Sequence, residues 1–181
     1  MAPEARFDST LSAAQSGAEW ALGSLYRRLQ PTLLRYLRAQ EPGEAEDLAS
    51  EVWLDIAHGI GRFEGDEPAF RRWAFTIARR RLIDFRRSRA RRRTHPAPIE
   101  VAARHPGQAE PGVDEAALSH LASLPPEQAE IVLLRIVAGF DSNEVALITG
   151  KKPGTVRVIQ KRALERLAQL IEAESEDVVT R

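Results

Sequence analysis

Hydrophobic residues recur every three or four positions along most of the chain, which is the spacing of amphipathic helices. One such pattern covers residues 19–39, a second covers residues 44–60, and a third begins near Pro68. A group of shorter helices is expected between residues 115 and 173. Proline at position 31 is expected to kink or divide the first helix, because it has no backbone N–H to donate. No useful stretch alternates with the period of a strand, so the sequence predicts an all-α fold.

The third pattern combines aromatic and basic residues. The segment from Ala69 to Arg93 contains eleven arginines and one acid. On a helix, its hydrophobic residues cover one broad face and several arginines lie opposite. This face consists of Phe70, Trp73, Ala74, Ile77, Ala78, Leu82 and Phe85. We predict that the helix runs to about Arg87, that most of its aromatic rings fill a core, and that the arginines bind a polyanion.

Trp73 lies at the edge of this hydrophobic face. Its ring could therefore contact either the core or a nucleic acid. Aromatic rings next to cations suit single-stranded nucleic acid, because the rings stack on bases while the cations neutralise phosphates. The last part of the segment, Ser88 to Arg93, is expected to make less specific phosphate contacts.

Residues 94–113 are rich in proline and form the best candidate for a domain boundary. Proline at this density prevents helix formation and favours an extended, flexible segment. We therefore predict two small helical domains, residues 18–93 and residues 114–172, joined by this linker. Residues 1–17 are expected to form a mobile N-terminus, and residues 173–181 an acidic tail.

Charge is strongly segregated although the chain of 181 residues has a formal net charge of zero. Basic residues concentrate in residues 71–93 and again in residues 150–170, which suggests two separate contacts with polyanions. The absence of cysteine excludes disulfides and thiolate metal sites. No segment has the apolar length of a signal peptide or a membrane span, so we expect a soluble cytoplasmic protein without a membrane partner.

The second basic block lies within a helix-turn-helix pattern. Asp141 or Ser142 can cap one helix, which Gly150 would end, and Thr155 can cap the next after a short turn. The second helix of such a pair enters the DNA major groove. Arg157 and Lys161 lie one turn apart on its polar side, where they could bond guanine edges or phosphates. The alternative is an ordinary helical hairpin with a solvated basic face.

Taken together, the order and spacing of these segments resemble an extracytoplasmic-function (ECF) sigma factor of the bacterial primary-sigma superfamily. The resemblance spans about residues 20–171. It rests on the segments LYRRLQPTLLRYLR, EAEDLASEVWLDI, FRRWAFTIARRRLIDFRR, LPPEQAEIVLLR and GKKPGTVRVIQKRALERL. It implies a factor that binds core RNA polymerase, recognises the minus-35 and minus-10 promoter elements and promotes DNA melting. It implies no enzymatic activity and no cofactor.

The resemblance also implies three sets of functional residues. The helix-turn-helix would contact the minus-35 element through Lys152, Thr155, Arg157, Val158, Lys161 and Arg162. The minus-10 element would contact Phe63, Glu64, Gly65, Asp66, Arg72, Trp73, Arg79 and Arg80, the first four of which belong to a loop that receives a flipped base. Polymerase would contact Asp47, Leu48, Ser50, Glu51 and Asp55, with the three acids exposed and Leu48 and Val52 beneath them.

The partners implied are the β′ clamp helices and β flap of core polymerase, and promoter DNA. Whether an anti-sigma factor also binds is left open. Three other functions were weighed. A helix-turn-helix regulator that acts without polymerase explains residues 125–171 but not the Trp73 helix. An interaction module would use only the acidic helix of residues 44–59. A di-metal enzyme would need a second pair like Asp55 and His58, and the sequence contains none.

Overall fold

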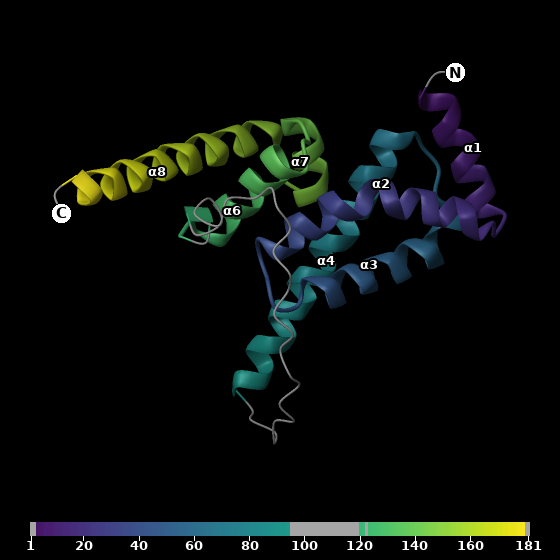
Figure 1. Cartoon of the computed structure of the whole chain (residues 1–181), viewed down its shortest axis with the longest axis horizontal. Helices are drawn as coiled ribbons and strands as arrows, with labels where there is room; N and C mark the ends of the chain where they lie inside the picture. Colours follow the sequence, from purple (N-terminus) through teal and green to yellow (C-terminus); the bar gives the residue numbers. More distant parts are fainter. Residues whose placement is uncertain (1–2, 95–119, 122, 180–181) are drawn as a thin grey trace. The chain divides into compact units, whose positions relative to one another are not determined.

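The computed structural model describes residues 3–94, 120–121 and 123–179, and all regular structure among them is helical (Figure 1). The chain divides into two compact units. Helices α1 to α4 belong to the first unit and α6 to α8 to the second. The predicted all-α fold is therefore confirmed. The predicted linker lies outside the described residues, except that Thr94 is the last residue of α4.

The first unit is a bundle whose helices are α1 (Pro3–Gln15), α2 (Glu19–Arg38), α3 (Ala45–Gly59) and α4 (Glu67–Thr94). A short 3-10 helix, η1 (Ile60–Arg62), follows α3. Helices α2, α3 and α4 pack against one another, and α1 packs against α2, η1 and α4. The core is made of side chains that repeat at helical spacing on the facing sides. They include Leu25, Leu29, Leu33, Leu37, Leu48, Val52, Ile56, Ala74, Phe75, Ala78 and Leu82.

Helix α1 corrects the predicted mobile N-terminus at residues 1–17. Phe7 is 1% exposed, and its ring lies 5.8 Å from that of Phe70 on α4. Leu11 and Ala14 are also buried. The hydrophobic pattern of this helix is short and interrupted by polar residues. Burial of these side chains against α2 and α4 stabilises the helix, and the sequence pattern of α1 alone does not predict this burial.

Two helices are longer or less divided than predicted. Pro31 lies inside α2 without dividing it. Buried residues on both sides, Leu29 and Leu33, pack into the core and offset the missing backbone hydrogen bond. Helix α4 also does not end near Arg87 but continues to Thr94, so its last turns extend beyond α2 and α3 (Figure 1).

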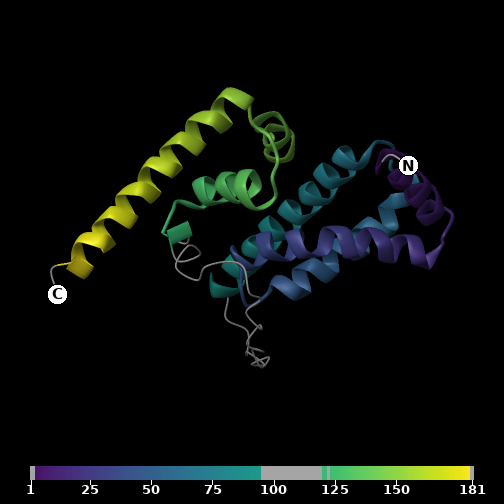
Figure 2. The ribbon, with the colours of Figure 1, turned by 45° about the horizontal axis from the view of Figure 1, so that its top comes forward.

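The second unit contains α6 (Pro126–Val132), a π-helical segment η2 (Leu133–Val137), α7 (Ser142–Thr149) and α8 (Pro153–Val179). Its core includes Leu124, Ile131, Leu133, Leu134, Phe140, Val145, Ile148, Val156 and Ala163. Helix α6 and α7 both pack against α8. The prediction of a separate acidic tail from residue 173 is wrong for the described residues. Helix α8 continues through this segment to Val179 and extends beyond α6 (Figure 2).

The helix ends of the helix-turn-helix are largely as predicted. Asp141 caps α7, and the Glu144 carboxylate accepts a hydrogen bond from the Asp141 backbone N–H, which completes a capping box. Gly150 ends α7 with φ of 71°. The predicted cap at Thr155 is wrong. Helix α8 already begins at Pro153, and the carbonyl of Lys152 accepts its first backbone bond, from Val156. Proline fits the first turn because its fixed φ is helical and its missing N–H is not needed there.

Candidate nucleic-acid interface

Helix α8 presents a basic surface and buries the opposite side. Val156 and Ala163 are fully buried in the second unit. All six residues predicted for minus-35 contact are exposed, as the burial pattern of this helix requires. They are Lys152, Thr155, Arg157, Val158, Lys161 and Arg162. This is the arrangement that a helix needs to enter a groove while remaining anchored to its own domain.

Arg135 joins the π-helical segment η2 to α8. Its guanidinium donates to the side-chain oxygen of Gln160 at 3.0 Å and also to the backbone carbonyl of Phe140. Arg135 lies in the π-helical segment, where the extra residue per turn changes the direction of side chains. Burial of Val156 and Ala163 sets which side of α8 faces the core, and the Arg135–Gln160 bond is consistent with that orientation. Gln160 is half-buried, whereas Arg157 and Lys161 are exposed.

The first unit contains a loop between η1 and α4 whose aromatic residue is anchored. The ring of Phe63 stacks on Trp73 with a centroid distance of 5.1 Å and an interplanar angle of 27°. It also meets the ring of Phe70 edge-on at 5.6 Å. A Cβ atom on Gly59 would lie 2.8 Å from Trp73, so glycine makes room for the indole. Trp73 is thus half-buried against its own protein, with Phe63 covering part of the ring.

Asp66 and Gly65 have clear structural roles in the same loop. The carboxylate of Asp66 accepts a hydrogen bond from the Ala69 backbone N–H at 2.8 Å, which caps α4. Gly65 has φ of 145°, and a Cβ there would lie 2.8 Å from the Cβ of Ala69. Glu64 and Gly65 are the exposed tip between the anchored Phe63 and the capping Asp66. The loop is therefore short and held at both ends.

The predicted arginines of α4 differ in exposure. Arg72 and Arg79 are half-buried, and Arg80 is exposed. Arg80 donates to Asp55 on α3 at 3.0 Å, although its side chain is 63% exposed. Arg87, Arg89, Arg91 and Arg92 are exposed along the later turns. A polyanion running along α4 would meet a continuous series of guanidinium groups.

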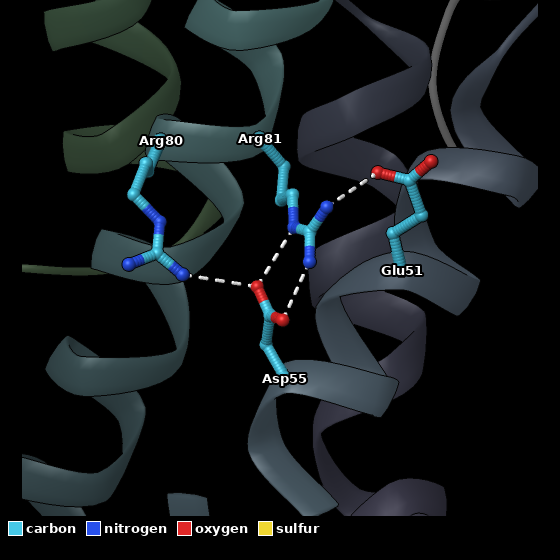
Figure 3. A network of polar contacts seen from close by, with 4 residues as sticks. All are labelled: Glu51, Asp55, Arg80 and Arg81. Atoms are coloured by element: carbon cyan, nitrogen blue, oxygen red, sulfur yellow. Dashed lines mark hydrogen bonds and ion pairs between the residues drawn. The ribbon is translucent and has the colours of Figure 1, made fainter. Parts of the chain in front are cut away.

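Asp55 is the centre of a network that joins α3 to α4 (Figure 3). Arg81 donates to the two oxygens of Asp55 from Nε and Nη2, with the Nε bond at 2.7 Å, and to Glu51 at 3.1 Å. The hydrogen bonds from Arg81, followed by those from Arg80, hold the pKa of Asp55 below its ordinary value despite partial burial. The same bonds from Asp55 raise the pKa of Arg81. This two-pronged pair links the two helices beside their packed hydrophobic side chains.

The predicted polymerase residues of α3 divide into exposed and buried groups. Asp47, Ser50 and Glu51 are exposed, whereas Leu48 and Val52 lie beneath them as expected. Asp55 corrects the prediction of an exposed acid, because its side chain is only 18% exposed and bonded to two arginines. Leu54, a hydrophobic residue of the same helix, is 60% exposed. The outer side of α3 therefore offers both acids and a hydrophobic side chain to a partner.

Within the described residues, no group of three or more histidine, aspartate or glutamate side chains is close enough to hold a metal ion. None of the described helices has the length and hydrophobicity to cross a membrane.

Comparison with protein families assigns both units. A family model for Sigma-70 region 2 matches residues 25–92, and one for Sigma-70, region 4 matches residues 115–167. The chain is 32% identical over 178 residues to the ECF RNA polymerase sigma factor ShbA of Streptomyces griseus subsp. griseus, with 88% of this chain and 92% of ShbA covered. The chain belongs to the ECF sigma factors.

Two further proteins are similar to this ECF sigma factor. BldN, an ECF RNA polymerase sigma factor of Streptomyces coelicolor, is 34% identical over 175 residues, which are 92% of this chain and 66% of BldN. The solved structure of the sigma factor RpoE from Bartonella quintana, in complex with the anti-sigma factor NepR, matches with a TM-score of 0.69 and 26% identity. That match covers 83% of this chain and 96% of RpoE.

Family membership confirms the predicted class of function. This ECF sigma factor directs RNA polymerase to promoters and is a transcription initiation factor rather than an enzyme. Its two candidate DNA-binding surfaces lie in different units. Helix α4 belongs to the unit matched by Sigma-70 region 2, and α8 to the unit matched by Sigma-70, region 4.

Several residues that organise these surfaces have no recognisable signal in the sequence. No individual role is predicted for Arg81 within the basic segment, nor for Arg135. Gln15, in the segment expected to be mobile, donates to the backbone of Ile60 and Phe63. Each of these contacts joins residues at least 25 positions apart, so no local pattern announces them.

Proposed function

We propose that this sigma factor binds core polymerase through α3, binds the minus-10 element through the 63–66 loop and α4, and reads the minus-35 element through α8. The observation that carries the proposal is the different construction of its two basic surfaces. The surface on α4 includes a half-exposed indole and an exposed loop tip. The surface on α8 is a regular helix face without aromatic residues.

The α8 surface suits double-stranded DNA. Arg157 lies in the second turn of the helix, close to its N-terminus, where recognition helices approach base edges. An arginine there can donate two bonds to guanine, and neighbouring lysines can neutralise phosphates. The burial of Val156 and Ala163 supports this role, because it leaves Arg157 and Lys161 on the exposed side of the helix.

The α4 surface suits DNA that is being opened. Unstacking costs a few kcal/mol per base step. Stacking on an aromatic ring can return about 1–3 kcal/mol per base. Trp73 and the loop tip offer contacts for an unpaired base, and the arginines of α4 would bind the adjacent phosphates. In this proposal, Trp73 contacts the base through the part of its ring that Phe63 does not cover.

Polymerase binding is assigned to the outer side of α3. Asp47, Ser50 and Glu51 are exposed there, with Leu48 beneath them and Asp55 holding the helix against α4. Acidic and hydrophobic groups together would fit the β′ clamp helices, and the second unit would bind the β flap. The complex of the similar RpoE with an anti-sigma factor supports a further proposal, that such a factor regulates this chain in the cytoplasm.

Run-off transcription with core polymerase and a library of promoters tests the proposal. We expect the protein to make core polymerase initiate at one promoter class that has conserved sequences in two separated elements. The isolated second unit should bind the same duplex only weakly. Tight binding of duplex DNA by the protein alone, without initiation, would instead indicate a helix-turn-helix regulator that acts without polymerase.

A further inference from the structure

We infer that Gln15 on α1 is a positioning residue for the loop that receives an unpaired minus-10 base. This inference rests on the proposed function of the 63–66 loop. The side-chain amide of Gln15 donates to the carbonyl of Phe63 at 2.8 Å and to the carbonyl of Ile60 at 3.1 Å. These two bonds connect α1 to the chain 45 and 48 residues later.

Gln15 is itself held in place by the end of α1. Gly17 has φ of 85°, the backbone N–H of Ala18 donates to Ala13 at 2.9 Å, and that of Gly17 donates to Ala14 at 3.0 Å. These bonds form a Schellman turn, which closes the helix in one geometry. Together with buried Phe7 and Leu11, this turn fixes where the Gln15 side chain begins.

The carbonyls that accept from Gln15 belong to the backbone that carries Phe63. The N–H of Phe63 donates to the carbonyl of Ile60 at 3.1 Å, so Gln15 bonds to both ends of this turn. The Phe63 ring is fixed separately, by stacking on Trp73. The main chain and the side chain of Phe63 are thus held by different elements, α1 and α4.

The consequence for the loop is geometric. Only Glu64 and Gly65 separate the anchored Phe63 from the Asp66 cap of α4. When both ends of so short a connection are fixed, its backbone groups have one arrangement before DNA arrives. Preorganisation of this kind improves affinity because less conformational entropy is lost on binding. Loss of the Gln15 bonds should therefore weaken capture of the flipped base, and leave duplex contacts unaffected.

The test compares holoenzymes made with wild-type protein, Gln15→Glu and Ser16→Ala. Glutamate keeps the shape of Gln15 but cannot donate to either carbonyl. Ser16 is the matched control, because it is adjacent and exposed, and its hydroxyl donates only within α1, to Ser12 at 2.9 Å. Each holoenzyme is titrated with the single-stranded non-template minus-10 sequence of a promoter that it transcribes, and with versions abasic at one position each.

For wild type, the abasic position that lowers affinity most identifies the base held by the loop. The ratio of the affinity for the intact strand to the affinity for the strand abasic at that position measures capture of the base. We expect Gln15→Glu to reduce this ratio by about three- to tenfold, the range expected for a lost hydrogen bond. Ser16→Ala should keep the wild-type ratio. Circular dichroism and polymerase affinity should be the same for all three proteins.

Two other results are distinguishable. If Gln15→Glu lowers affinity for intact and abasic strands equally, or keeps the wild-type ratio, Gln15 does not position the loop and the inference is wrong. If wild-type holoenzyme initiates transcription but is insensitive to every abasic position, the proposed role of the loop fails first, and the inference about Gln15 fails with it.

Discussion

At the scale of single residues, exposure decides which of the arginines and lysines can meet DNA. Arg157 and Arg162 are exposed on a helix whose opposite side is buried, so their charges are available. Arg81 has the same side chain but lies between two carboxylates, and its role is to join α3 to α4. Residue type alone does not distinguish these two roles. The partner within reach of each guanidinium does.

Arg157→Ala should lower discrimination at one base pair of the minus-35 element by about 1–3 kcal/mol, because a two-bond contact with guanine is lost. The measurement is selection of binding sites by holoenzyme from DNA randomised in that element. Arg166→Ala is the control, since Arg166 is exposed two turns further along α8 and outside the predicted contact set. Unchanged base preference in Arg157→Ala would remove this residue from the reading surface.

At the scale of helices, an ion pair joins the two elements that carry the candidate surfaces of the first unit. The Asp55–Arg81 pair is half-buried and two-pronged, unlike a single contact on the surface. It lies between the outer face of α3 and the basic side of α4. The same residues therefore position a candidate polymerase surface and a candidate DNA surface.

Asp55→Asn should lower the free energy of unfolding of the first unit by about 1 kcal/mol near neutral pH. The folded-state pKa of Asp55 lies below the ordinary 3.8. Its contribution is therefore complete above the unfolded pKa and disappears as the pH falls through the folded value. The difference between wild type and variant should vanish in acid.

Urea unfolding followed by tryptophan fluorescence measures this difference at several pH values. All three tryptophans lie in the first unit, so the signal reports on it alone. Asp84→Asn, a change of an exposed acid on α4, is the control and should have little effect. A difference between wild type and Asp55→Asn that persists undiminished in acid would show that the ion pair is not its cause.

At the scale of the whole molecule, each of the two units has its own hydrophobic core. Phe75 is fully buried in the first unit and contacts Tyr36, with ring centroids 5.3 Å apart. Phe140 is equally buried in the second unit. Each core supports one basic surface, so the two proposed promoter contacts depend on separate sets of packed residues.

Phe75→Ala should destabilise the first unit by about 3–5 kcal/mol, because it leaves a cavity in the core. Hydrogen exchange followed by mass spectrometry should then become faster in α1 to α4 and stay unchanged in α6 to α8. Phe140→Ala should have the opposite distribution and serves as the matched control. Faster exchange in both units from either change would show that the two cores are coupled.

The sequence by itself determined the helical class, the division into two helical units and most of the helix-turn-helix. Those features depend on local signals, such as the Asp141 cap, the left-handed Gly150 and the spacing of buried residues in α8. The resemblance to ECF sigma factors added the class of function, which family comparison then confirmed.

Only the tertiary structure decided how the surfaces are supported. It ordered α1 through Phe7, paired Arg81 with Asp55, stacked Phe63 on Trp73 and directed Gln15 to the loop. These contacts join elements that are distant in sequence. Their stabilising free energy appears only when the partner is in place, so no periodic pattern in one segment could predict them.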